Sequence, residues 1–108
     1  MWNPPTKKQL EKIPDLYSTE GTPAEEKKIY MKFFMGGWTW YIAEISHKNW
    51  DTMFGYVVSP LEPRGEWGYI SLNELKSIKK GFIEVDREIH GITPYTPVKF
   101  KEIQRRRL

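Results

Sequence analysis

The chain has 108 residues, the size of one domain, and a net charge of +3. It contains no cysteine, which excludes disulfide bonds, thiolate chemistry and cysteine-based zinc sites. No apolar run approaches the roughly 20 residues of a membrane span, and residues 1–9 lack the apolar core of a signal peptide. We therefore expect a cytoplasmic protein that does not contact a membrane.

The positive charge is concentrated at the C-terminus. Residues 97–108 contain five basic side chains and one acidic side chain, whereas residues 1–96 contain 12 basic and 13 acidic side chains. A reader of double-stranded DNA needs a basic face on its folded body, and residues 1–96 are too close to neutral to supply one. We therefore divide the chain into a single domain over residues 1–96 and a basic helix or tail over residues 97–108.

Two helix-start signals occur near the N-terminus. Thr6 and Gln9 have the spacing of a capping box, and Pro14 ends the short helix that follows. The segment Thr22-Pro23-Ala24-Glu25 repeats the signal with proline at the first helical position, which predicts a single helical turn.

The middle of the chain is typical of an antiparallel sheet. Residues 28–33 alternate between apolar and polar side chains, which predicts a half-buried strand, and Gly36-Gly37 predicts the hairpin turn that follows it. The next strand, 38–45, is rich in aromatic residues. Strict alternation gives it one face with Trp38, Trp40, Ile42 and Glu44, and another with Thr39, Tyr41, Ala43 and Ile45.

Two further strands share the pattern aromatic, glycine, tyrosine, β-branched. They cover residues 54–57 and 67–70, and the loop 59–66 between them predicts an antiparallel pair. Glycine weakens a strand, so Gly55 and Gly68 indicate that aromatic rings from a neighbouring strand pack directly on the backbone.

Helical signals return after this sheet. Ser71 and Glu74 form a capping box, and Gly81 marks the expected end of that helix. Residues 82–89 are expected to form an edge strand, and Thr96-Pro97 to begin a final helix. The whole pattern predicts an α+β domain with an antiparallel sheet of about four or five strands and short helices packed on one face.

Several segments between about residues 10 and 90 resemble domain-of-unknown-function family 2958, a group of small proteins carried by bacterial plasmids, integrative elements and phages. Their order is Leu16-Tyr17-Ser18-Thr19-Glu20, Lys32-Phe33-Phe34, Trp38-Thr39-Trp40-Tyr41 with Glu44, Phe54-Gly55-Tyr56-Val57, Glu66-Trp67-Gly68-Tyr69-Ile70-Ser71-Leu72 with Glu74-Leu75, and Asp86-Arg87-Glu88-Ile89-His90. An aromatic residue commonly follows the last segment in the family, where this chain has Gly91. The resemblance implies a mobile-element setting in a bacterial host cell and an α+β fold, but no established activity.

The charged residues Glu20, Glu44, Asp86, Arg87 and Glu88 have two interpretations. Gathered beside the sheet, they would form an acid–base or metal site. Alternatively, Arg87 bridges acids from neighbouring elements as a structural ion pair, which we favour because the sequence has no nucleophile–base pair. His47 and His90 lack the spacing of metal ligands, so we expect no metal site, no cofactor and no catalytic residue.

The aromatic residues provide the candidate binding surface. An exposed platform would stack nucleobases, an interface would supply protein-binding hot spots, and a core would bury the rings. We expect most rings to be buried, with Tyr30, Trp50 and one of Trp38 or Trp40 the most exposed. The candidate binding residues are Trp38, Trp40, Glu44, Trp50, Tyr56, Trp67 and Arg87, and the candidate phosphate contacts in the tail are Arg105, Arg106 and Arg107.

We expect a non-enzymatic binding module of a mobile genetic element, a monomer or weak homodimer that engages a host or element protein, with a role in counter-defence. The alternative is a single-stranded nucleic-acid accessory factor that uses the aromatic platform and the basic tail. A small hydrolase using the carboxylates of Glu20, Glu44 and Glu88 ranks third.

Overall fold

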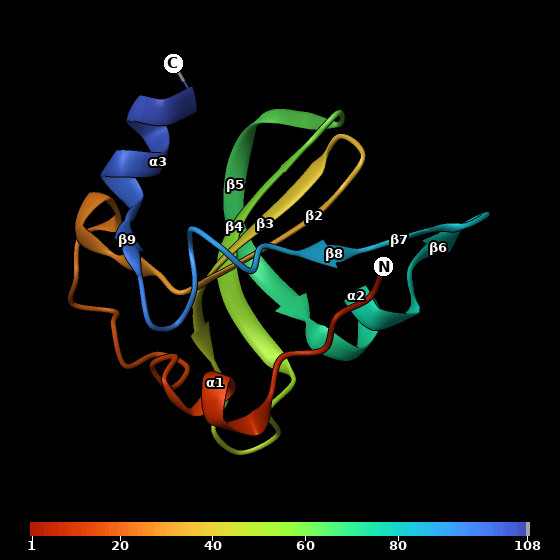
Figure 1. The fold of residues 1–108 in the computed structure, drawn as a ribbon. Helices are drawn as coiled ribbons and strands as arrows, with labels where there is room; N and C mark the ends of the chain where they lie inside the picture. The colour runs from red at the N-terminus through yellow and green to blue at the C-terminus, as the bar shows by residue number, and fades with distance from the viewer. Residues whose placement is uncertain (108) are drawn as a thin grey trace.

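The computed structural model describes residues 1–107 of the chain, with Arg107 described by its backbone alone. At its centre is a five-stranded antiparallel sheet with the strand order β5-β4-β3-β2-β8 (Figure 1). These strands are β2 (Met31–Met35), β3 (Trp38–Ile45), β4 (Thr52–Ser59), β5 (Glu62–Ser71) and β8 (Asp86–Arg87). The predicted α+β fold with an antiparallel sheet of four or five strands is therefore confirmed.

The remaining elements of residues 1–107 are short. Two-residue strands form two further antiparallel pairs, β1 (Lys28–Ile29) with β9 (Val98–Lys99) and β6 (Lys79–Lys80) with β7 (Ile83–Glu84). The helical elements are α1 (Lys7–Glu11), the 3₁₀ turn η1 (Ala24–Glu26), α2 (Leu72–Ser77) and α3 (Phe100–Arg107).

The consecutive strands β2 to β5 form a meander. Gly36-Gly37 joins β2 to β3, as the sequence predicts, and Gly36 adopts the left-handed conformation, with a φ of 57°. The antiparallel pairing of β4 with β5 is also confirmed, but the loop predicted over residues 59–66 is wrong. Its turn is only Pro60-Leu61, because β5 already begins at Glu62.

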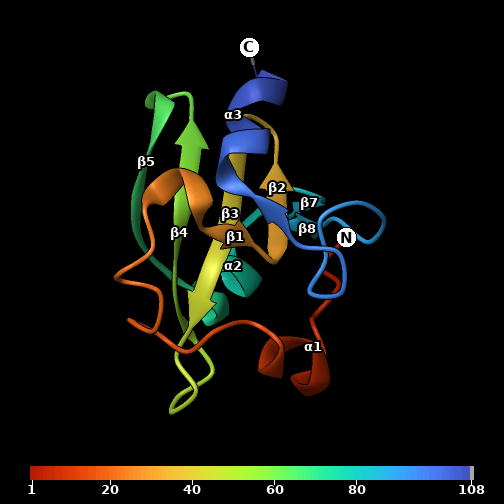
Figure 2. The ribbon, with the colours of Figure 1, turned by 90° about the vertical axis from the view of Figure 1, so that its left-hand side faces the viewer.

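Each face of the sheet is covered by its own hydrophobic cluster. The first face packs against α1 and α2, and its buried cluster is Leu10, Ile13, Met31, Phe33, Trp40, Ile42, Ile45, Met53, Ile70, Leu75 and Val85. The second face packs against α3, and its buried cluster is Ile29, Tyr41, Ala43, Ile92, Phe100 and Ile103. Figure 2 shows α3 in front of the sheet and α2 behind it. Helices thus cover both faces of the sheet rather than one.

A β-bulge in β3 changes the predicted alternation of its side chains. The pairing with β4 shifts between Ile42 and Glu44, so Ala43 is the additional residue. Beyond the bulge, Ile45 joins Ile42 in the first-face cluster, and Glu44 lies on the second face. The prediction that Glu44 shares a face with Trp40 is therefore wrong, because alternation with a period of two fails where a strand bulges.

Two of the predicted helix caps are present, whereas one predicted helix end and one predicted helix start are displaced. The Thr6–Gln9 capping box is present, with Gln9 N donating to Thr6 Oγ1 at 3.1 Å and Thr6 N to Gln9 Oε1 at 2.8 Å. Ser71 caps α2 as predicted. Gly81, however, lies in the turn between β6 and β7, and the helix expected from Thr96-Pro97 begins only at Phe100, after β9.

Candidate functional site

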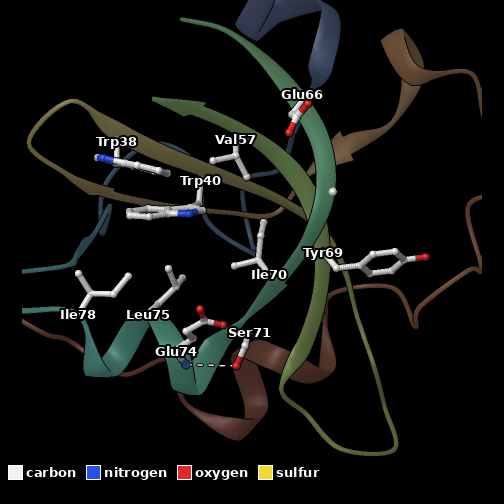
Figure 3. Close-up of a pocket in the computed structure, with 11 residues that line it drawn as sticks. Trp38, Trp40, Val57, Glu66, Tyr69, Ile70, Ser71, Glu74, Leu75 and Ile78 are labelled. Atoms are coloured by element: carbon white, nitrogen blue, oxygen red, sulfur yellow. Dashed lines mark hydrogen bonds between the residues drawn. The ribbon is translucent and has the colours of Figure 1, made fainter. Parts of the chain in front are cut away.

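A groove of about 390 Å³ lies on the first face, between α2 and the outer strands of the sheet (Figure 3). We call it the Trp groove. It is lined by Trp38, Trp40, Val57, Glu66, Gly68, Tyr69, Ile70, Ser71, Glu74, Leu75 and Ile78.

Two tryptophans form one wall of the Trp groove. Trp38 and Trp40 are two residues apart in β3, so both side chains leave the same face of the sheet. Their rings are stacked, with centroids 5.8 Å apart and an angle of 20° between the planes. Figure 3 shows both rings on the side of the groove opposite Leu75 and Ile78. Trp40 is buried, whereas Trp38 is half-buried and presents part of its ring to the groove.

The opposite wall is α2, which is held in place at its first turn. The carboxylate of Asp51 accepts hydrogen bonds from the Ser71 hydroxyl at 3.1 Å and from Asn73 N at 2.7 Å. The Ser71 hydroxyl in turn accepts from Glu74 N at 3.1 Å. Because these bonds satisfy donors at the helix start, α2 is fixed to the loop before β4.

The predicted ring packing on the two strand glycines is wrong, for two different reasons. Gly55 and Gly68 are directly opposite each other in β4 and β5. A Cβ atom added to Gly55 would overlap the carbonyl oxygen of Tyr41, so backbone rather than a ring approaches there. At Gly68 nothing lies within 4 Å of an added Cβ. Gly68 therefore leaves open space in the lining of the Trp groove.

The charged residues that line the Trp groove are both acidic. They are Glu66 on β5 and Glu74 on α2, and both are exposed. Neither carboxylate forms an ion pair within residues 1–107. The groove therefore combines an apolar interior with two negative charges that lack a cationic partner in the described part of the chain.

The groove lies beside an open edge of the sheet. β5 is the end strand of the sheet order, and among the described strands it pairs only with β4. Pro63 within β5 fits this position, because proline is tolerated on edge strands. An edge strand presents unpaired backbone N–H and C=O groups to a further strand.

Two aromatic residues of the second face, Tyr56 and Trp67, are half-buried and contact α3. The rings of Tyr56 and Trp67 lie 4.6 and 4.8 Å, respectively, from the ring of Phe100 in α3, measured between centroids. Trp67 also stacks on Phe54, with a centroid distance of 5.6 Å. The predicted platform therefore splits across the two faces, with Tyr56 and Trp67 beneath α3 and apart from Trp38 and Trp40.

Trp50 belongs to a separate contact at the base of the sheet. Its ring stacks on His47 with a centroid distance of 4.6 Å, and Lys7 Nζ lies 4.3 Å from the centroid of the Trp50 ring. His47 Nε2 lies 2.7 Å from the carbonyl oxygen of Ile13. Residues 1–107 contain no cluster of three or more histidines and acids suited to a metal ion, and His90 is exposed.

Glu44 anchors the connector between α1 and η1. Its side chain is 3% exposed, and its carboxylate accepts hydrogen bonds from Tyr17 N at 2.8 Å, from Thr19 N at 3.1 Å and from the Thr19 hydroxyl. Lys27 Nζ donates to the Thr19 hydroxyl at 2.9 Å. Both carboxylate oxygens are thus occupied by the connector, which favours a structural role for Glu44.

Arg87 is buried, but its predicted ion pairing with neighbouring acids is wrong. Its Nε donates to the backbone oxygen of Asn3 at 3.0 Å, and burial lowers the pKa of its guanidinium group. Asp86 contacts the amino group of Met1. Glu88 accepts from Ile92 N at 2.6 Å and lies 3.6 Å from Lys32 Nζ. Asp86 and Glu88 therefore have other partners, and the guanidinium group of Arg87 is bonded instead to the N-terminal segment, which is distant in sequence.

The three carboxylates considered for hydrolysis are not brought together. Glu20 and Glu44 line one pocket on the second face, whereas Glu88 pairs with Lys32 beyond it.

In the tail, Arg105 is paired with Glu102 at 2.9 Å, and Arg106 lines a small pocket with Lys32, Tyr41, Ile92 and Ile103. The side chain of Arg107 lies outside the described residues.

Of the seven predicted binding residues, only Trp38 and Trp40 line the Trp groove. The other lining residues were missed because their sequence signal is that of a core. Leu75 and Ile78 form the apolar stripe of an amphipathic helix, which indicates burial but not that α2 leaves the tryptophans partly open. None of the five tryptophans is fully exposed, and Tyr30 is half-buried, so the expected exposure of Tyr30 and Trp50 is only partial.

Comparison with known proteins gave no match, because no protein-family model, curated protein or solved structure is significantly similar to this chain. Among the residues that the structure describes, no helix combines the length and apolar character needed to cross a bilayer.

Proposed function

We propose that this chain is a non-enzymatic binding module that engages a protein partner through the Trp groove and the outer edge of β5. The observation that carries this proposal is the stacked Trp38–Trp40 pair, in which Trp38 is only partly buried and lines a groove that extends to the edge strand β5. Tryptophan is among the residues that contribute most to protein interfaces.

The two features complement each other in one recognition mode. A partner segment that adds a strand to β5 gains main-chain hydrogen bonds along the edge, and its alternate side chains point to one face of the sheet. On the first face, those side chains meet the Trp groove. The partner segment would therefore be an extended peptide with apolar side chains at alternate positions.

The acidic lining determines the charge of the partner. Glu66 and Glu74 lack a cationic partner within the described residues and stand on opposite sides of an apolar groove. A lysine or arginine of the partner would pair with them and fix its register, since complementary charges chiefly add specificity. The bacterial cytoplasm, a mobile-element setting and a counter-defence role are part of the proposal on the family resemblance alone.

A displayed library of random extended peptides tests the proposal. We expect selected peptides to alternate apolar residues and to carry a lysine or arginine. Trp38→Ala should weaken their binding by about 30-fold or more, the loss typical of a hot-spot residue. Glu66→Lys should weaken them through charge reversal.

The matched control is Glu25→Lys, which makes the same charge change at an exposed glutamate of η1, outside the Trp groove and away from β5. Peptides that bind Trp38→Ala and Glu66→Lys as tightly as the unchanged protein would disprove the proposed site. A single-stranded oligonucleotide that instead binds with steep salt dependence, reduced by removal of residues 104–108, would favour the nucleic-acid function.

A further inference from the structure

A second, smaller pocket lies on the second face of the sheet; it shares Tyr69 with the lining of the Trp groove, but the Tyr69 ring points away from that groove (Figure 3). We call it the Tyr pocket, and its volume is about 230 Å³. It is lined by Tyr17, Glu20, Lys27, Glu44, Phe54 and Tyr69. This volume is below that of sites for drug-sized ligands and suits one small chemical group of a ligand.

Aromatic rings form the walls of the Tyr pocket. The ring of Tyr69 meets the ring of Tyr17 at 66°, with 6.4 Å between centroids, and the ring of Phe54 at 61°, with 5.5 Å. Tyr69 therefore stands steeply angled between the other two rings. Tyr17 and Tyr69 are each more than half exposed, so the rings are open to a ligand.

The position of Tyr17 is enforced rather than incidental. Its backbone lies in the left-handed region, with a φ of 71°, which is uncommon for a residue other than glycine. The buried carboxylate of Glu44 holds this conformation by accepting the hydrogen bond of Tyr17 N. The Tyr17 hydroxyl also accepts a hydrogen bond of 3.3 Å from the Tyr69 hydroxyl. The aromatic walls are thus tied together before any ligand binds.

The charges around the pocket sum to one negative formal charge, from Glu20, Glu44 and Lys27. The ammonium group of Lys27 is already bonded to the backbone oxygen and the hydroxyl of Thr19. Glu20, by contrast, forms no ion pair within residues 1–107. The pKa of the Tyr69 phenol is raised, first by the hydrogen bond with Tyr17, then by desolvation and by the nearby charges of Glu20 and Glu44.

We propose that the Tyr pocket binds an alkylammonium group, held against the faces of Tyr17, Tyr69 and Phe54 and attracted by Glu20. Aromatic faces attract cations within about 6 Å of a ring centroid, and quaternary ammonium ligands are recognised by clustered aromatic rings. This site goes beyond the proposed peptide interface, because the ammonium group is supplied either by a free small molecule or by a methylated lysine of a protein.

Choline is the first probe, with amide NMR spectra of the full chain as the measurement. We expect saturable shifts at Tyr17, Thr19 and Tyr69, since the first two amides bond directly to Glu44. The carbon analogue of choline, in which a quaternary carbon replaces the nitrogen, should bind several-fold more weakly because it lacks the charge. A short peptide with trimethyllysine distinguishes the source: tighter binding than choline indicates a protein side chain, and weaker or equal binding a free ligand.

Variants test the walls and the charge separately. Tyr69→Leu should weaken choline binding by about 3- to 30-fold, the range of one cation–π contact. Glu20→Gln should weaken it less and reduce its salt dependence. The matched control is Tyr95→Leu, which removes a similarly exposed tyrosine outside the pocket.

The proposal fails if choline causes no saturable shift, if the carbon analogue binds equally well, or if Tyr69→Leu and Tyr95→Leu bind choline alike. Should Tyr69→Leu lose its dispersed spectrum, Glu20→Gln decides, because Glu20 is exposed and forms no side-chain contact that the fold requires. Unchanged choline affinity in a folded Glu20→Gln variant would then overturn the site.

Discussion

Among the residues that the structure describes, the two faces of the central sheet each bury one charged side chain, but they hold it in different ways. On the second face, Glu44 accepts three hydrogen bonds from Tyr17 and Thr19 and so shapes the connector before η1. On the first face, Arg87 donates to a single residue, Asn3. The difference indicates that Glu44 satisfies backbone N–H groups of the connector that would otherwise lack a hydrogen-bond partner. Arg87 contributes mainly through the packing of its side chain against the N-terminal segment.

The aromatic residues differ between the faces in the same sense. Tyr56, Trp67 and Trp38 are all half-buried, but Tyr56 and Trp67 pack against Phe100 of α3, whereas Trp38 faces the groove between the sheet and α2. Rings that are buried to a similar extent therefore belong to a packed contact on one face and to the wall of a groove on the other. What decides is the element that lies over them.

The largest effect is expected from the core of the first face. Phe33 is fully buried and stacks on Trp2, with 5.9 Å between ring centroids. Phe33→Ala should lower the free energy of unfolding by roughly 3–5 kcal/mol, because it removes buried apolar area and leaves a cavity. Urea unfolding measures this loss. A cost below about 1 kcal/mol would mean that the first face is not the main core.

Glu44→Gln should have the next largest effect. The amide replaces one accepting oxygen with a donor, so a buried N–H or hydroxyl of the connector loses its partner. We expect a loss of about 2–3 kcal/mol, equivalent to a decrease in Tm of roughly 10 °C. Thermal unfolding followed by circular dichroism provides the measurement. An unchanged Tm would contradict the anchoring role.

Arg87→Met tests the buried charge of the first face, for comparison with Glu44 on the second. An apolar side chain of similar length keeps the packing and removes the cost of burying a charge, so the loss should be about 1 kcal/mol or less. The loss of two hydrogen bonds to Asn3 offsets that gain. The same unfolding experiment applies, and a cost equal to that of Glu44→Gln would show that both buried charges are equally structural.

The smallest effect concerns a surface contact between η1 and the C-terminal elements. Hydrogen bonds with Lys99 and Lys101 lower the pKa of the Glu26 carboxyl, at 2.8 and 3.0 Å. A folded pKa below the unfolded one adds stability above the unfolded pKa, and this is lost as the pH falls through the folded pKa. Glu26→Gln should therefore decrease Tm slightly at about pH 7, and this decrease should shrink as the pH falls through the folded pKa and the carboxyl becomes protonated. A difference that persists in acid would exclude this ion pair as its cause.

Signals between residues close in the sequence were sufficient to predict much of the fold. The capping box at Thr6 and the turn at Gly36-Gly37 act between residues close in sequence, and both are present in the structure. The bulge at Ala43 was not predictable, because it depends on how β3 pairs with β4. The partner of Arg87 lies 84 residues away at Asn3, a distance over which the sequence carries no local pattern.

The candidate sites follow the same division. Alternation along β3 correctly placed Trp38 and Trp40 together, and these two residues form the wall of the Trp groove. The Tyr pocket was not foreseen, because it combines Tyr17 of a connector with Phe54 and Tyr69 of two strands. The bulge that turns Glu44 toward this pocket is invisible to a rule based on strict alternation.

The facing pair Gly55 and Gly68 has a consequence for variation of this chain. In a library of all single substitutions, Gly55 should accept no other residue, because even the methyl group of alanine would meet the Tyr41 carbonyl. Gly68 should accept alanine or serine without loss of folding, since its added atoms would enter the Trp groove. Two glycines that look equivalent in the sequence would thus respond to different selections. Substitution of Gly55 would be rejected in a selection for folding, whereas substitution of Gly68 would matter only in a selection for binding in the Trp groove.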